Sequence, residues 1–141
     1  MRHVKAFTYQ PKIEGVRSGK ITQTIRKPGK RSVKVGDTIT FHGWSGKPYR
    51  SPWSWRIEVE VTCVVNPILR EEGIIAEYGP FMYSWDSETV DGLARNDGID
   101  PPTGKELKRV LKSLNKDWEG TYQIIKWRIR DRGEKDQKED G

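Results

Sequence analysis

The sequence predicts one α+β domain built around a small mixed β-barrel. Three observations favour this fold class: strand-like segments dominate the first half of the chain, two amphipathic helices follow, and a last strand-like segment comes after the helices. The 141 residues, 33% of them apolar, suffice for a single hydrophobic core. The domain is expected to cover residues 1–129, with no internal repeat and no second domain.

In chain order, the expected elements begin with a strand over residues 4–9. Pro11 is typical of the first turn of a helix and Gly19 of a helix end, so a short N-terminal helix is predicted between them. Residues 38–42 and 56–65 alternate apolar and polar side chains, as half-buried strands do. The second of these strands is expected to anchor the core.

The segment between those strands, residues 43–55, contains two glycines, two prolines and three tryptophans. So many residues that interrupt regular structure predict a loop. Trp53 and Trp55 are candidates for stacking on an unpaired base, at about 1–3 kcal/mol per base. The alternative is that the loop covers one end of the barrel.

Two helices are predicted before the last strand. Residues 86–98 carry an apolar stripe and end in glycine, and residues 103–114 start with Thr103 at the spacing of a capping box. Residues 121–129 alternate as a closing strand. Residues 130–141 are charged and lack apolar side chains, which predicts a disordered tail.

The positive charge is concentrated in the first part of the chain. The formal net charge of +6 divides into +9 over residues 1–60 and −3 over residues 61–141. Clustered cations attract a charged backbone. A polyanionic partner such as RNA is therefore expected, with a solvated basic surface as the alternative.

Cysteine and histidine content limits other kinds of site. The single Cys63 excludes an internal disulfide and a multi-cysteine zinc site. His3 and His42 lack matched partners, so no metal is expected, and both are predicted at the surface or at a strand edge. No segment has the roughly 18 apolar residues of a membrane span. The expectation is a cytoplasmic monomer without a cofactor or a membrane partner.

Polar and basic side chains gather over residues 22–31. Because side chains alternate along a strand, Thr22, Thr24 and Arg26 share one face. The guanidinium of Arg26 offers a planar fork of donors for phosphate, and threonine hydroxyls suit a base edge. The cations expected to hold phosphate are Arg26, Lys27, Lys30 and Arg31.

Five segments follow one another in a characteristic order: the helix ending in glycine, the pattern Gly19-x-Ile21-x-x-Thr24-x-Arg26, the Val-Gly-Asp entry to a strand at 35–37, the helix end at 94–99 and the closing segment 124–127. Together they resemble an ASCH domain of the PUA-like superfamily, and the resemblance spans residues 4–129. It implies a PUA-like barrel with a cleft and an association with RNA or modified nucleosides.

Some small ASCH proteins are amidohydrolases that remove the acetyl group from N4-acetylcytidine, with a lysine, a threonine and a carboxylate. The resemblance puts the threonine at Thr24 and the carboxylate at Asp97, in place of the usual glutamate. The lysine position is Ile21, whose side chain can neither take a proton nor stabilise an oxyanion. Lys20 is the candidate replacement, although neighbours on an extended chain point to opposite sides.

Two interpretations of Asp97 remain open at this point. It lies on the inward stripe of its predicted helix, in the last turn, where burial and the helix dipole raise a carboxyl pKa and favour an acid or base. Alternatively, it only accepts hydrogen bonds at the turn before Gly98.

Three functions are considered on these grounds. The leading one is a nucleic-acid-binding ASCH domain that recognises single-stranded or modified RNA, with Thr24 and Asp97 lining a base-sized pocket. The alternative is a small amidohydrolase for an N-acylated nucleoside, with Lys20, Thr24 and Asp97 as catalytic residues. The third is an interaction module that uses the barrel only as a scaffold.

Overall fold

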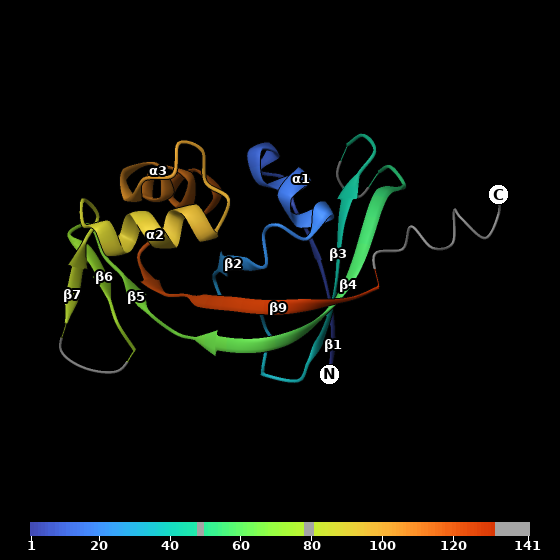
Figure 1. Cartoon of the computed structure of the whole chain (residues 1–141), viewed down its shortest axis with the longest axis horizontal. Coiled ribbons are helices and arrows are strands. Elements are labelled where there is room, and N and C mark those ends of the chain that lie inside the picture. Colours follow the sequence, from blue (N-terminus) through green and yellow to red (C-terminus); the bar gives the residue numbers. More distant parts are fainter. Residues whose placement is uncertain (48–49, 78–80, 132–141) are drawn as a thin grey trace.

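The computed structural model of the chain describes residues 1–47, 50–77 and 81–131, which form two β-sheets and three α-helices (Figure 1). The helices are α1 (Gln10–Ser18), α2 (Glu88–Asn96) and α3 (Gly104–Leu114). The strands are β1 (Arg2–Ala6), β2 (Gln23–Arg26), β3 (Thr38–Trp44), β4 (Trp53–Val65), β5 (Ile68–Leu69), β6 (Gly73–Ile75), β7 (Met82–Ser84), β8 (Gly120–Thr121) and β9 (Gln123–Asp131).

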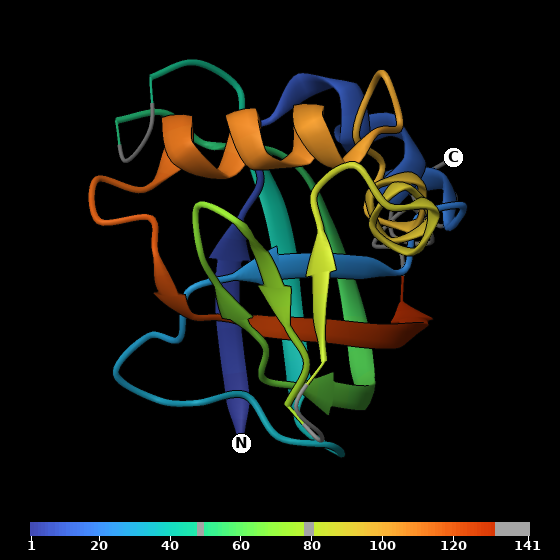
Figure 2. The ribbon, with the colours of Figure 1, turned by 90° about the vertical axis from the view of Figure 1, so that its left-hand side faces the viewer.

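The larger sheet has the strand order β1-β3-β4-β9-β2, in which β1 and β3 are parallel and the other neighbours antiparallel. The pairing of β4 with β9 shifts register between Glu58 and Val59 and between Val61 and Cys63. Such irregularities bend strands, and Figure 2 shows β2 and β9 running across β1 and β3. The predicted α+β class is confirmed, and the predicted small barrel takes the form of a curled half-barrel sheet.

A second, four-stranded sheet has the order β7-β6-β5-β8. It is not among the predicted elements, because its strands are two or three residues long and too short to show alternation. Figure 1 shows it at one end of the molecule, beneath α2 and α3.

The three helices agree with the predicted ones. Ser87 caps α2 by accepting a hydrogen bond from the Val90 amide, and Thr103 caps α3 by accepting one from the Glu106 amide. Each helix buries its apolar face in one of two clusters. Val16 of α1 packs on the larger sheet, whereas α2 and α3 pack on the second sheet and on the start of β9. The strand β2 lies where the two clusters meet.

The predicted loop over residues 43–55 is wrong at both of its ends. Strand β3 extends to Trp44 and β4 begins at Trp53, so that these two residues pair across the hairpin, as do Gly43 and Trp55. The indole of Trp55 lies so close to Gly43 that any side chain there would collide with it. Glycine at this position is therefore part of the strand pair. Residues 48–49 lie outside the described part.

The closing strand is shifted by about two residues from the predicted range 121–129, because Thr121 belongs to β8 and β9 begins at Gln123. Residues 130 and 131 belong to β9, and Asp131 pairs with Glu58 of β4. The rest of the predicted tail, residues 132–141, lies outside the described residues.

The two histidines lie in different surroundings. His3 is on the edge strand β1, as predicted. His42 is buried in the inner strand β3 and stacks on Trp53, at 4.0 Å between ring centroids. The prediction for His42 is wrong, because the strands of the hairpin cover it.

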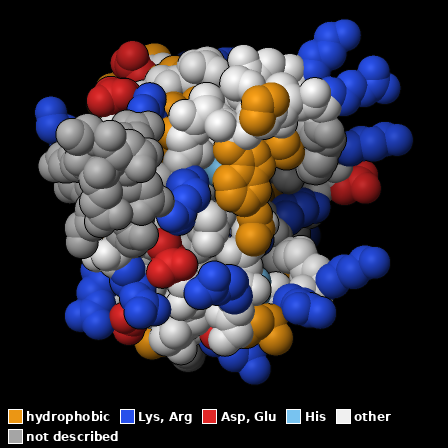
Figure 3. Space-filling model, turned by 90° about the vertical axis from the view of Figure 1, so that its right-hand side faces the viewer, with side chains coloured by type: hydrophobic (Ala, Val, Ile, Leu, Met, Phe, Trp, Pro, Cys, Tyr) orange, Lys and Arg blue, Asp and Glu red, His pale blue; other side chains and the backbone are white. Residues whose placement is uncertain are grey.

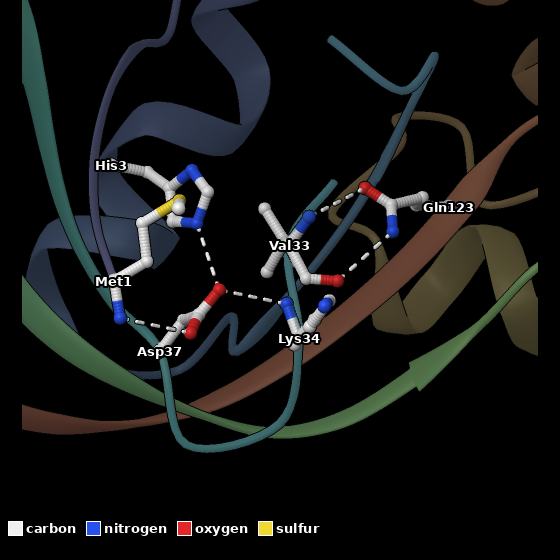
Figure 4. Close-up of polar contacts among 6 residues, drawn as sticks. All are labelled: Met1, His3, Val33, Lys34, Asp37 and Gln123. Carbon is white, nitrogen blue, oxygen red and sulfur yellow. Dashed lines mark hydrogen bonds and ion pairs between the residues drawn. The ribbon is translucent and has the colours of Figure 1, made fainter. Parts of the chain in front are cut away.

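Asp37 ties the start of β3 to β1 (Figure 4). Its carboxylate lies 2.9 Å from His3 Nε2, accepts a 2.9 Å hydrogen bond from the Lys34 amide, and lies 3.2 Å from the amino group of Met1. Nearby, the amide side chain of Gln123 makes two hydrogen bonds with the backbone of Val33. Burial alone would raise the pKa of Asp37, but these hydrogen bonds lower it to about 2.

The variant Asp37→Asn is expected to lose about 2 kcal/mol of stability at neutral pH, since a charged hydrogen-bonded acceptor is removed. A carboxyl whose pKa is lowered by folding stabilises the protein above its ordinary pKa of 3.8 and loses that effect as the pH falls towards 2. Urea unfolding at several pH values measures both the stability loss at neutral pH and its decrease at low pH. The exposed Asp86→Asn is the control, and equal curves for the two variants would contradict the role of Asp37.

Candidate functional site

A cavity of about 300 Å³ opens over β2, between α1 and the C-terminal half of α3. Four of the polar side chains that line it come from three elements: Lys12 from α1, Thr24 and Arg26 from β2, and Asp97 from the C-cap of α2. Three of them are almost completely buried, with 5%, 2% and 3% of Lys12, Thr24 and Asp97 exposed. Polar groups in such a position need partners.

Lys12 joins the other groups. Its Nζ donates to Thr24 Oγ1 at 3.1 Å and to Asp97 Oδ2 at 3.1 Å. Asp97 is held from its other side, because Gln23 Nε2 donates to Asp97 Oδ1 at 3.4 Å and to the Leu93 carbonyl at 3.3 Å. A hydroxyl, an amine and a carboxylate thus form one continuous hydrogen-bonded chain.

The local fold explains why the lysine lies there. Lys12 is one helical turn before Val16, on the buried face of α1. Gly98 then lets the end of α2 approach this face: its φ is +78°, and a Cβ there would lie 2.9 Å from Lys12 Cβ. Glycine is required at position 98 both by its backbone conformation and by this close approach.

Arg26 is fixed at the wall of the cavity. One of its terminal nitrogens donates to the Ala6 carbonyl at 2.7 Å, and its guanidinium lies over the rings of Phe7 and Phe41, at 4.6 and 5.9 Å from their centroids. Its Nε is buried and has no hydrogen-bond partner among the described residues. The guanidinium is therefore held in one orientation, with one buried donor unpaired.

Burial has the largest effect on the titration of these groups. It lowers the pKa of Lys12, and the charge of Arg26 acts in the same direction, while Asp97 opposes it. Burial raises the pKa of Asp97, against the effects of Lys12, Gln23 and Arg26. Burial also lowers the pKa of Arg26 to about 10, so that the guanidinium stays charged at neutral pH. Both members of the ion pair are thereby shifted towards their neutral forms.

The cavity is electropositive. Among the described residues that line it, Lys5, Lys12, Arg26 and Lys27 are basic and Asp97 is the one acid. An excess of cations around a concave site favours a ligand with a phosphate or another anionic group.

The structure brings Asp97 together with Thr24 and Arg26, which are far from it in the sequence, and these three residues were predicted as one site. Lys27, also predicted, lines the same cavity. The predicted catalytic residue Lys20 is not part of this site, because it is exposed and lies outside the cavity lining. The side chain of Lys20 extends from the turn after α1 into solvent, and its role as the replacement stays a prediction.

Ile21 has a packing role. A Cβ on Gly15 would lie 2.4 Å from the Ile21 side chain, and one on Gly98 would lie 3.2 Å from it. The isoleucine therefore fills the space between α1 and the end of α2, while the amine comes from Lys12. One signal for Lys12 was present in the sequence: it is four residues before Val16, on the predicted apolar face of a short helix.

The remaining predicted binding residues lie elsewhere. Thr22, Lys30 and Arg31 are exposed and do not line the cavity. Trp53 is 43% exposed, and Trp55 lines a separate cavity of about 360 Å³ beside Arg17. That these residues hold RNA stays a prediction.

Comparison with known proteins finds no family model that matches the chain, no matching curated protein and no matching solved structure. Within the described ranges, no helix is long and apolar enough to cross a membrane. In the same part of the chain, no group of three or more His, Cys, Asp or Glu side chains is arranged to hold a metal ion.

Proposed function

We propose that the protein is an ASCH-like amidohydrolase that removes the acyl group from an N-acylated nucleoside or nucleotide such as N4-acetylcytidine. One observation carries the proposal: Lys12 Nζ lies within hydrogen-bonding distance of both Thr24 Oγ1 and Asp97 Oδ2 at the wall of an electropositive cavity. A hydroxyl beside a base that a third group orients is the usual arrangement of an activated nucleophile.

Each group has a role in the proposed reaction. Neutral Lys12 takes the proton of Thr24, whose oxygen attacks the acyl carbonyl, and the Arg26 guanidinium stabilises the negative charge on the carbonyl oxygen. The Lys12 ammonium then gives its proton to the departing amine. Lys12 next takes a proton from water, whose oxygen attacks the ester carbonyl of acylated Thr24. As the acid leaves, Lys12 returns that proton to Thr24 Oγ1, and both groups are restored. Asp97 orients the amine and stabilises its charged form.

The cavity suits a small substrate. Its volume of about 300 Å³ is at the lower end of ligand pockets, which range over about 300–1,000 Å³. The Arg26 Nε without a partner offers a hydrogen bond to a carbonyl oxygen, and Lys5 and Lys27 are placed on the lining to attract a phosphate. A single modified base with its sugar and phosphate therefore agrees with both the size and the charge of the site.

The experiment is to incubate the protein with N4-acetylcytidine and its 5′-monophosphate and to follow cytidine products and acetate by chromatography. Both products are expected in equal amounts, and faster from the monophosphate. If neither compound is hydrolysed while cytidine monophosphate still binds, the site is a binding site without this chemistry. If nothing binds, the proposal is wrong.

Binding to single-stranded RNA is a second candidate function, and a different surface favours it. Figure 3 shows hydrophobic side chains exposed in the middle of a face that also carries many Lys and Arg side chains. Trp53, which is 43% exposed, and Arg17, whose guanidinium lies 5.9 Å from the Trp55 ring, combine stacking surface with positive charge. Proteins that bind single strands use this combination.

A short single-stranded RNA is expected to quench the tryptophan fluorescence. It should also bind less tightly as salt is added, because the Lys and Arg side chains that contact its phosphates release the counterions of the RNA. The variant Trp53→Ala should weaken this binding by about 1–3 kcal/mol, whereas Trp118→Phe, on the other side of the molecule, should not. Absence of quenching, or an affinity independent of salt, would exclude this second function.

A further inference from the structure

A second cavity, of about 500 Å³, lies on the other side of β2 from the candidate active site. Its wall is mainly apolar and includes one face of α2, residues of the second sheet, the start of β9, and Gln23 of β2. Figure 2 shows the second sheet in front of β2 and β9, with α2 beside it. Ile74 of β6 and Gly92 and Leu93 of α2 are among the lining residues.

Gln23 is the polar group that distinguishes this wall. Only 2% of the residue is exposed. Its Nε2 donates to the carbonyl of Leu93 and to Asp97 Oδ1, both of which are acceptors, so the amide cannot be turned the other way round. Oε1 consequently lies on the opposite side of the amide. It is buried, and it has no hydrogen-bond partner among the described residues.

A buried acceptor without a donor is costly, by about 1–3 kcal/mol. Here the acceptor belongs to a residue that lines a cavity large enough for a ring system. A ligand that brings a donor to Gln23 Oε1 while covering the apolar wall would satisfy both features at once.

We propose that this second cavity is a binding site for a small, uncharged aromatic ring that carries an N–H or O–H donor. The ring packs against Ile74 and Leu93, and the donor forms a hydrogen bond to Gln23 Oε1. The site is separate from the candidate active site, because Asp97 and Thr24 line the first cavity and Gln23 lines the second. It does not depend on the proposed hydrolysis.

Indole and 1-methylindole are a matched pair of probes, since the methyl group removes the only N–H donor. Indole is expected to shift the methyl NMR signals of Ile74 and Leu93 in a saturable way. 1-Methylindole should bind about 10-fold more weakly, because Gln23 Oε1 then stays without a partner in a filled cavity.

Gly92 supplies variants that test the location. A Cβ at this helical position would meet no atom within 4 Å, and Gly92 lines the cavity. Gly92→Phe should fill the space and abolish indole binding without loss of folding, and Gly92→Ala should retain binding with a more stable helix. The unfolding curve of each variant verifies that it is folded.

Three results would overturn the proposal: no saturable shift at Ile74 and Leu93, equal affinity for indole and 1-methylindole, or unchanged indole binding by folded Gly92→Phe. If Gly92→Phe does not fold, Leu93→Trp and Ile74→Phe replace it, and indole binding by either folded variant at the original affinity has the same meaning.

Discussion

Asp97→Leu is expected to lower the free energy of unfolding by about 3–5 kcal/mol, because it leaves the Lys12 ammonium buried without its counter-charge. The Lys12 and Asp97 side chains are 6% and 4% exposed and 3.1 Å apart, so each is the main partner of the other's charge. The double variant Lys12→Met/Asp97→Leu should recover most of the loss, since two apolar side chains of similar volume then fill the same space. Urea unfolding of the wild type and of both variants measures these differences.

A surface ion pair provides the control. Arg128 and Glu60 are 2.9 Å apart, but Arg128 is 69% exposed. Arg128→Met should therefore change stability by less than about 1 kcal/mol. If Asp97→Leu were as mild as Arg128→Met, or if the double variant were as unstable as Asp97→Leu alone, the Lys12–Asp97 pair would not be a buried pair in solution.

Lys12→Met is expected to slow the hydrolysis of N4-acetylcytidine by about 10²–10⁴-fold, the usual contribution of a positioned acid or base. The fold should persist, because the loss of Lys12 leaves a carboxyl group whose pKa burial already raises and which can take up a proton. Steady-state rates and cytidine monophosphate affinity separate chemistry from binding.

Lys20→Met is the matched control for that experiment. Lys20 is exposed and lies outside the cavity lining, so its replacement should leave the rate within about twofold of the wild type, as surface substitutions usually do. The opposite pattern, with a slow Lys20→Met and an active Lys12→Met, would show that the turn after α1 moves and that Lys20 is the base.

The pH dependence of the hydrolysis rate follows from the titration of Lys12. Lys12 acts as a base only when deprotonated, so activity should rise with pH through its pKa. Because burial and Arg26 lower that pKa, the rise should be centred below the ordinary value of 10.5. A rate that still increases in proportion to hydroxide concentration above pH 10.5 would exclude Lys12 as the base.

The sequence predicted the elements with strong periodicity. That Thr24 and Arg26 share a strand face needs only the two-residue repeat, and the apolar stripe of α2 puts Asp97 on its inward side. Those patterns are local and do not show how the elements pack. That Asp97 meets Thr24 and Arg26 was an expectation from the resemblance to ASCH domains.

What the sequence did not predict depends on packing between elements. Lys12 enters the site because Gly98 lets two helix ends approach each other, and a single sequence does not show that approach. Lys20 was favoured instead because it is next to Ile21 in the chain. The amine that reaches Thr24 belongs to Lys12, in the preceding helix α1. The second sheet was not predicted, because its strands are too short to show an alternation of apolar and polar side chains.

The central claim is that Lys12 and Thr24 act as one unit on an acyl group. The most direct test is the single-turnover rate of acetate release from N4-acetylcytidine by the wild type, Lys12→Met, Thr24→Val and the double variant. Residues of one catalytic unit are not additive, so the double variant should be no slower than the slower single variant. A wild type without acetate release, or losses that multiply in the double variant, would contradict the claim.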